Sequence, residues 1–278
     1  MNYSDLFNLT FVIFSTLFGI VLGSFLNVVI YRIPVGKTIV KGHSVCMSCN
    51  HNLSALDLVP IFSWLFLGGK CRYCHAPIAS RYCKIESFTG VCFLVTALTH
   101  QNLSLFFADT YPYLVLSSFV SYCMFLMMIC CVVSVMMIFY DTRKGFWGFP
   151  FITTLGFIGY VICTFARNYK VDVLLKLSGV SLIGMLLFAV VTYILFFFSK
   201  KQYSKNDFFF DLSMGSALVF TAFYAKVYSV LWYVPALVAV YALTRFLTKD
   251  RKGEKYVGIL FACLIVIQVI ISYFINTI

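Results

Sequence analysis

Uninterrupted apolar runs dominate this sequence, and they are long enough to cross a lipid bilayer. The first run extends from Phe7 to Tyr31, and about 20 apolar residues in a helix span the hydrocarbon core. Only 11% of all residues are charged, against about 25% in an average soluble domain. The first run is too long for the apolar region of a signal peptide, and no basic residue precedes it, which favours a retained helix. These features exclude a soluble globular domain.

Eight segments are predicted to form transmembrane helices. They cover residues 7–31, 85–99, 112–139, 147–166, 173–198, 208–226, 229–246 and 256–276. The expected fold class is an all-α polytopic membrane protein with about eight transmembrane helices and a small cytosolic zinc-knuckle loop domain. Its parts are a first transmembrane helix (1–31), a polar loop (32–84) and a helical membrane domain (85–278).

Basic residues are distributed unevenly along this arrangement, and the chain has a net charge of +11. If the loop 32–84 faces the cytosol, nearly all of the 21 lysines and arginines fall in cytosolic segments. The exceptions are Arg167, Lys170, Lys176 and Lys226. This is the positive-inside bias of membrane proteins. It predicts a cytosolic loop and explains the basic charge without any nucleic-acid partner.

Four cysteines in the polar loop form two CxxC pairs, Cys46-Met-Ser-Cys49 and Cys71-Arg-Tyr-Cys74. Two such knuckles place four thiolates around one ion, the usual arrangement for structural zinc. The alternatives are two redox pairs or a disulfide hairpin, but a loop on the reducing side of the membrane favours free thiols or metal. Because a closed four-thiolate site leaves no open coordination position, we expect this zinc to maintain the shape of the loop.

One apolar stretch in the loop, Leu58–Leu67, is too short to span a bilayer. It fits either the membrane interface, with Trp64 at the level of the headgroups, or a position under the metal knuckles.

Four carboxylates remain at the cytosolic ends of predicted spans: Glu86, Asp141, Asp207 and Asp211. Intramembrane carboxylates are usually functional or paired. Two aspartates from different helices could form an aspartyl-protease dyad that shares one proton. The other reading is a set of juxtamembrane ion pairs with neighbouring lysines and arginines. The remaining acidic residues, Asp57 among them, are expected to be solvated surface charges.

Several short motifs in the first 90 residues occur in a characteristic order. They are Gly23–Val28 (GSFLNV), Tyr31–Pro34 (YRIP), Asp57–Pro60 (DLVP), Ser63–Leu65 (SWL), Gly69–Cys74 (GKCRYC) and Ser80–Glu86 (SRYCKIE). Together they resemble the type IV prepilin leader peptidases, bacterial membrane aspartyl peptidases that mature type IV pilins and related pseudopilins. Cys83 stands where that family has a proline.

The resemblance implies a catalytic pair, Asp141 and Asp207. Asp141 begins a segment in which Trp147–Phe149 replace the family's Ile/Leu-Pro-Asp/Asn. The family's G-x-G-D motif aligns with Ser204–Asp207 (SKND), so both glycines are replaced here. Asp211, one helical turn further on, is the alternative second acid.

The resemblance further implies cleavage of the leader of a prepilin or pseudopilin on the cytosolic side of the bacterial cytoplasmic membrane. Such proteins serve type IV pili, secretion or competence. It also implies N-methylation of the new N-terminus with S-adenosylmethionine, although the sequence has no glycine-rich cofactor turn. The partners would be this substrate and the lipid bilayer. The alternatives are a catalytically weakened relative, either a methyltransferase alone or a binding protein, and a zinc-knuckled membrane scaffold or transporter.

Overall fold

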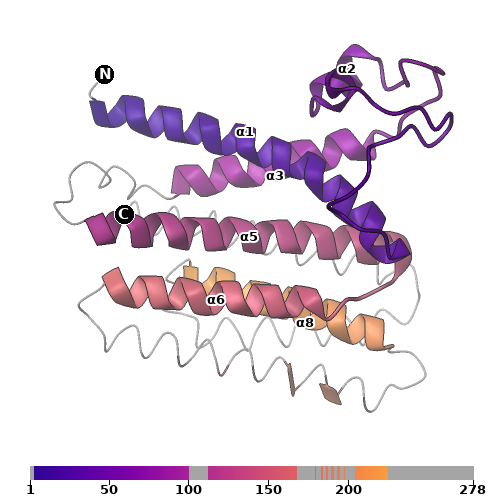
Figure 1. Ribbon diagram of the computed structural model, residues 1–278. Coiled ribbons are helices and arrows are strands. Elements are labelled where there is room, and N and C mark those ends of the chain that lie inside the picture. Colours follow the sequence, from indigo (N-terminus) through magenta and orange to yellow (C-terminus); the bar gives the residue numbers. More distant parts are fainter. Residues whose placement is uncertain are drawn as a thin grey trace. The chain divides into compact units, whose positions relative to one another are not determined.

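The computed structural model describes residues 3–99, 112–167 and 204–224, together with isolated helical positions between 179 and 197. These residues are mostly helical and contain no strand beyond two isolated bridges, which confirms the all-α prediction. The chain divides into two compact units, Met1–Leu98 and Thr99–Ile278 (Figure 1). The predicted spans 229–246 and 256–276 lie outside the described residues, and 173–198 is described only at the isolated positions.

Two of the described helices are long and apolar enough to cross a membrane, judged by length and composition. They are Asp5–Val35 and Leu116–Thr142, and a shorter apolar helix covers Gly148–Cys163. The helical character of the predicted spans is thus supported where they are described. The total of eight crossings stays a prediction.

In the first unit, helix α1 (Tyr3–Arg32) packs against helix α3 (Arg81–Thr99) through glycines. A Cβ atom built on Gly23 would lie 2.7 Å from the Glu86 Cα, and one on Gly19 would lie 2.6 Å from the Phe93 Cβ. Small residues spaced by four allow two helix backbones to approach closely. This approach places the second turn of α3 against the C-terminal half of α1.

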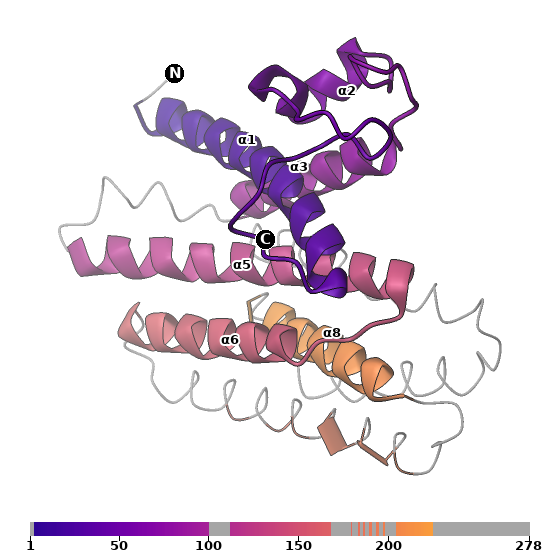
Figure 2. The same cartoon turned by 45° about the vertical axis from the view of Figure 1, so that its right-hand side comes forward.

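The loop between α1 and α3 holds three short helical elements. They are η1 (Ile33–Val35), η2 (Ala55–Leu58) and α2 (Phe62–Phe66), and the loop forms a lobe beside the start of α3 (Figure 2). The Arg32 guanidinium donates hydrogen bonds to the carbonyls of Thr38 and Lys41 at 3.1 and 2.9 Å and, over longer distances, to those of Gly42 and His43. One side chain thereby fixes the path of the chain as it leaves the first helix.

The contacts of Trp64 in α2 show how one side of the apolar stretch Leu58–Leu67 packs. Its indole Nε1–H donates to the carbonyl of Ile78 at 3.1 Å. Its ring covers Gly69, where a Cβ would lie 2.9 Å from the ring and where the backbone has a φ of +69°. Only glycine suits both conditions. This side therefore packs under the second knuckle, whereas Phe62 and Phe66 are exposed.

The second unit contains helices α5 (Pro112–Thr142), α6 (Gly148–Arg167) and α8 (Lys205–Tyr224). All three contact one another and lie side by side in Figure 1. The Phe220 ring lies at the centre, 5.8 Å from the ring centroids of both Phe125 and Phe157. A buried hydrogen bond of 2.6 Å joins the hydroxyls of Thr153 and Ser216, so α6 and α8 are held by polar as well as apolar contacts.

Candidate functional site

The first cysteine pair sits in a tight turn that its own backbone closes. The Cys46 amide donates to the His51 carbonyl and the Asn50 amide donates to the Cys46 carbonyl, both at 2.9 Å. Asn50 has a φ of 55°, and asparagine tolerates this left-handed region better than most residues. The turn orients the Cys46 and Cys49 side chains toward the same side.

The second cysteine pair repeats this geometry. The Cys71 amide donates to the Ala76 carbonyl and the His75 amide donates to the Cys71 carbonyl, again at 2.9 Å, and His75 has a φ of 57°. The His51 and Tyr73 rings, one from each turn, lie with their centroids 3.7 Å apart. The loop thus contains two matching knuckles that face each other.

The four predicted ligands converge. The Sγ atoms of Cys46, Cys49, Cys71 and Cys74 all lie within 4.8 Å of one another, and all four cysteines are free. The Cys46 and Cys74 sulfurs are 3.8 Å apart. A tetrahedron with metal–sulfur bonds of about 2.3 Å has sulfur–sulfur edges of about 3.8 Å, whereas a disulfide bond is about 2.05 Å long. The cluster can therefore hold a metal ion, and its four-sulfur donor set fits zinc.

The thiols of this cluster differ in acidity. Backbone hydrogen bonds from Cys49 and Ser48 lower the pKa of Cys46 to about 6. For Cys74, the backbone hydrogen bond from Ala76 lowers the pKa, but burial and the neighbouring thiols together raise it to about 12. Four thiolates this close repel one another, and a divalent cation would supply the missing countercharge.

Asp57 belongs to the architecture of this loop, which corrects its assignment as a solvated surface charge. Its side chain is only 5% exposed, and its Oδ1 accepts a hydrogen bond from the Arg72 Nε at 2.6 Å. The Ser54 and Tyr73 hydroxyls donate to its Oδ2 at 2.7 and 3.1 Å. Burial would raise the pKa of Asp57, but these hydrogen bonds outweigh it and lower the pKa to about 2. The carboxylate ties η2 to the second knuckle, a partnership that sequence spacing did not reveal.

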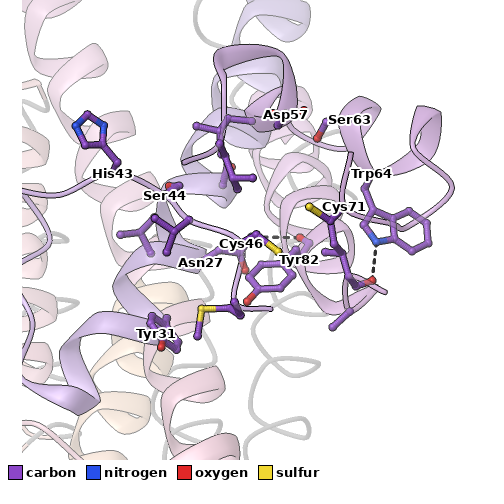
Figure 3. Close-up of a pocket in the computed structure, with 18 of the residues that line it drawn as sticks. Asn27, Tyr31, His43, Ser44, Cys46, Asp57, Ser63, Trp64, Cys71 and Tyr82 are labelled. Atoms are coloured by element: carbon purple, nitrogen blue, oxygen red, sulfur yellow. Dashed lines mark hydrogen bonds between the residues drawn. The ribbon is translucent and has the colours of Figure 1, made fainter. Parts of the chain in front are cut away.

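A cavity of about 770 Å³ lies between the loop, the C-terminal part of α1 and the start of α3. Asn27, Tyr31, Trp64 and Tyr82 are among the residues that line it (Figure 3). Ligand pockets for small molecules typically measure about 300–1,000 Å³. Glu86 also lines the cavity and is buried, with its Oε2 2.7 Å from the Ile61 amide nitrogen.

The three aspartates at the helix ends of the second unit lie in different environments. Asp141, near the end of α5, is exposed. Asp207 lies in the first turn of α8, where its Oδ2 accepts hydrogen bonds from the Ser204 hydroxyl at 2.6 Å and the Ser204 amide at 2.8 Å. In return, the Asp207 amide donates to the Ser204 hydroxyl oxygen at 3.3 Å. This reciprocal pattern is a capping box that begins the helix. Asp211, one turn further on, is 0% exposed.

The segments that carry Asp141 and Asp207 adjoin. The Phe139 ring, on the last turns of α5, stacks on the Phe210 ring of α8. Beyond the end of α5, a Cβ built on Gly145 would overlap the Asn206 carbonyl oxygen and lie 2.9 Å from the Asn206 carbonyl carbon. These contacts bring together the two helix ends on which the proposed acids lie.

Comparison with known proteins supports the resemblance over the first unit. Residues 17–100 match the bacterial peptidase A24 N-terminal domain family. The prepilin leader peptidase/N-methyltransferase of Myxococcus xanthus is 42% identical over 96 residues, which is 34% of this chain and 29% of that protein. The protein of the same name from Aeromonas hydrophila is 35% identical over 107 residues, covering 30% of this chain and 37% of that protein. The one from Dichelobacter nodosus is 35% identical over 125 residues, covering 35% and 44%.

These matches confirm the similarity to prepilin leader peptidases that the sequence motifs indicated. They cover less than half, 29% to 44%, of the length of these curated relatives. No solved structure matches this chain.

Proposed function

We propose that this protein is a membrane aspartic endopeptidase that removes the leader of a type IV prepilin-like protein and methylates the new N-terminus. The contact between the ends of α5 and α8 is the observation that carries the peptidase part, because it joins the segments of Asp141 and Asp207. The similarity of the first unit to prepilin leader peptidase/N-methyltransferases supports the substrate class and the methylation.

Asp141 and Asp207 would act as a pair that shares one proton. The ionised carboxylate accepts a proton from water as the water oxygen attacks the scissile carbonyl carbon. The protonated partner donates a hydrogen bond to the carbonyl oxygen. The Ser204 hydroxyl and amide both donate hydrogen bonds to Oδ2 of Asp207 and hold this carboxylate in place at the start of α8. Asp211 is the alternative second acid, since it is buried one turn further along the same helix.

The four cysteines would hold zinc as a structural ion. Two knuckles closed by their own backbone hydrogen bonds support this assignment. Because four thiolates fill the coordination of zinc, the ion would preserve the shape of the cavity wall and take no part in hydrolysis. S-adenosylmethionine would supply an electrophilic methyl group, and the cavity of about 770 Å³ is the proposed place for it.

The proposed location is the bacterial cytoplasmic membrane, with the zinc loop and the aspartates facing the cytosol. The excess of lysine and arginine in the loop 32–84 and in the other segments predicted to face the cytosol supports this orientation.

A catalytically weakened relative is the second candidate. Two observations favour it: Ser204–Asp207 lacks both glycines of the G-x-G-D pattern, and Asp207 is engaged in a helix-capping box. Such a protein would methylate or bind a processed pilin without cleaving it.

Co-expression with a candidate prepilin in membranes tests the proposal. We expect the wild type to yield processed pilin, and Asp141→Asn and Asp207→Asn to abolish processing, while Asp5→Asn in the first turn of α1 serves as the control. Intact mass of the pilin reports cleavage and methylation in the same sample. Processing by Asp207→Asn together with its loss in Asp211→Asn would move the second acid to Asp211. Methylation of a pre-cleaved pilin without any leader cleavage would establish the second candidate.

A further inference from the structure

Glu86 is a buried carboxylate that the proposed hydrolysis does not use. It lies in the second turn of α3 with 7% of its surface exposed, and its Oε2 accepts a hydrogen bond from the Ile61 amide at 2.7 Å. The side chains of Ser24 and Asn27 on α1 also hydrogen bond to it. Every one of these partners is neutral, and no lysine or arginine of the described residues pairs with it. A buried charge without a countercharge is costly.

The backbone that contacts Glu86 is strained. Ile61 has φ 63° and ψ −55°, and the Phe62 amide donates to the Pro60 carbonyl at 2.6 Å. These values describe the rare γ-turn with positive φ, which a β-branched residue seldom adopts. Strain of this kind is found most often at binding and catalytic sites. The carboxylate and the turn hold each other in place at the edge of the cavity.

Four lysines and arginines line the cavity, Arg32, Lys37, Lys41 and Arg72, and among the described residues none of them forms an ion pair with Glu86. Arg32 donates to a group of backbone carbonyls, and Arg72 is paired with Asp57. Glu86 and Asp57 are the two carboxylates that line the cavity, and of these only Asp57 has a cationic partner. The negative charge of Glu86 is therefore available to a ligand in a space large enough for a small molecule.

We infer that Glu86 forms the binding site for an organic cation in this cavity. The inference rests on the proposed function, because methyl transfer to an N-terminal amine brings two such cations together: the substrate ammonium and the sulfonium of the methyl donor.

The carboxylate of Glu86 would act differently on the two cations. A sulfonium against Glu86 would be bound by charge attraction. An ammonium against Glu86 would pass one proton to the carboxylate, which frees the nitrogen lone pair. That lone pair then forms the nitrogen–carbon bond as the carbon–sulfur bond breaks and leaves its electron pair on sulfur.

The test compares full-length wild type with Glu86→Gln in lipid nanodiscs. Glutamine can still accept the Ile61 hydrogen bond through its amide oxygen, so this variant removes the charge and keeps the γ-turn anchored. Lys84→Gln, an exposed position on the same helix, controls for a change of charge. The measurements are the affinities for S-adenosylmethionine and for its neutral thioether product, the methylation rate against the concentration of cleaved pilin, and leader cleavage.

A sulfonium site predicts that wild type prefers S-adenosylmethionine to the thioether product and that Glu86→Gln loses this preference by about tenfold or more. An ammonium site predicts unchanged affinity for S-adenosylmethionine and a KM for cleaved pilin raised by about tenfold. Leader cleavage stays at the wild-type level in both cases. If Glu86→Gln binds and methylates like wild type, Glu86 only anchors the loop and the inference is wrong. A wild type that neither cleaves nor methylates would instead refute the proposed function. Binding would still decide the inference in that case: it is overturned if wild type binds the charged and neutral compounds equally and if wild type and Glu86→Gln bind cleaved pilin equally.

Discussion

The rings of Phe139 and Phe210 stack with their centroids 4.0 Å apart and their planes inclined by 17°. Both rings are almost completely buried. Phe139 precedes Asp141 by two residues, and Phe210 follows Asp207 by three. The stack therefore fixes the distance between the two helix ends that carry the proposed acids.

Replacing Phe139 by alanine should lower leader cleavage strongly. The change removes the stack and leaves a cavity between α5 and α8, at a cost of about 3–5 kcal/mol for a buried phenylalanine in soluble proteins. Since positioning errors of about 1 Å can cost a hundredfold in rate, cleavage should fall further than the amount of folded protein. Phe151→Ala, at an exposed position on α6, is the control. Equal cleavage rates per folded protein in both variants would contradict this role of the stack.

The Asp57 hydrogen-bond network predicts a pH dependence confined to the zinc loop. Its folded pKa of about 2 lies below the ordinary value, which is about 3.9 in unfolded chains. The stabilisation is therefore present above about pH 4 and is lost as the pH falls toward 2. Hydrogen exchange of residues 54–58 and 71–75 should be slower in wild type than in Asp57→Asn at neutral pH.

This difference between wild type and Asp57→Asn should shrink as the pH falls from about 4 to 2. Comparing the two proteins at each pH removes the effect of thiol protonation and metal loss, which both share. A difference that stays constant down to pH 2 would show that the Asp57 charge does not stabilise the loop.

The parts of this site that sequence predicts are those closed by local turns. Each CxxC knuckle is completed by hydrogen bonds within six residues, so its spacing is sufficient to predict the sulfur cluster. The apolar runs likewise predict α1 and α5, because composition decides whether a helix suits a membrane. The ion pair between Asp57 and Arg72, by contrast, depends on how the loop folds back on itself.

Long-range packing also accounts for what the motifs did not reveal about Glu86. The family-like Ser80–Glu86 stretch marked the residue as noteworthy, yet its partner is a backbone amide in the strained turn at Ile61. No local sequence pattern predicts a γ-turn with positive φ at an isoleucine, because β-branched residues seldom adopt positive φ. The pairing arises only when the glycines of α1 let α3 approach.

Metal content provides a direct test of the four-cysteine site. Purified protein should contain about one zinc ion per chain, and Cys49→Ser or Cys74→Ser should lose it, because a serine oxygen replaces one of four thiolates. Cys83→Ser should keep its zinc, since Cys83 lies outside the sulfur cluster. Elemental analysis of the three variants, prepared in parallel with the wild type, measures the zinc content of each. Zinc retained by both knuckle variants would contradict the assignment.

Gly145 and Gly148 offer a matched pair for the junction between the two proposed acids. A methyl group on Gly145 would collide with the backbone carbonyl of Asn206, next to Asp207, whereas one on Gly148 would meet nothing within 4 Å. Backbone cannot yield as a flexible side chain does, so Gly145→Ala must push the start of α8 away from the end of α5. We expect Gly145→Ala to lose most leader cleavage and Gly148→Ala to keep it, both measured on the same prepilin. Methylation of pre-cleaved pilin should survive in both variants, because Glu86 and the cavity that it lines belong to the first unit. If Gly145→Ala cleaves as well as Gly148→Ala, the junction is not the place where the two carboxylates meet.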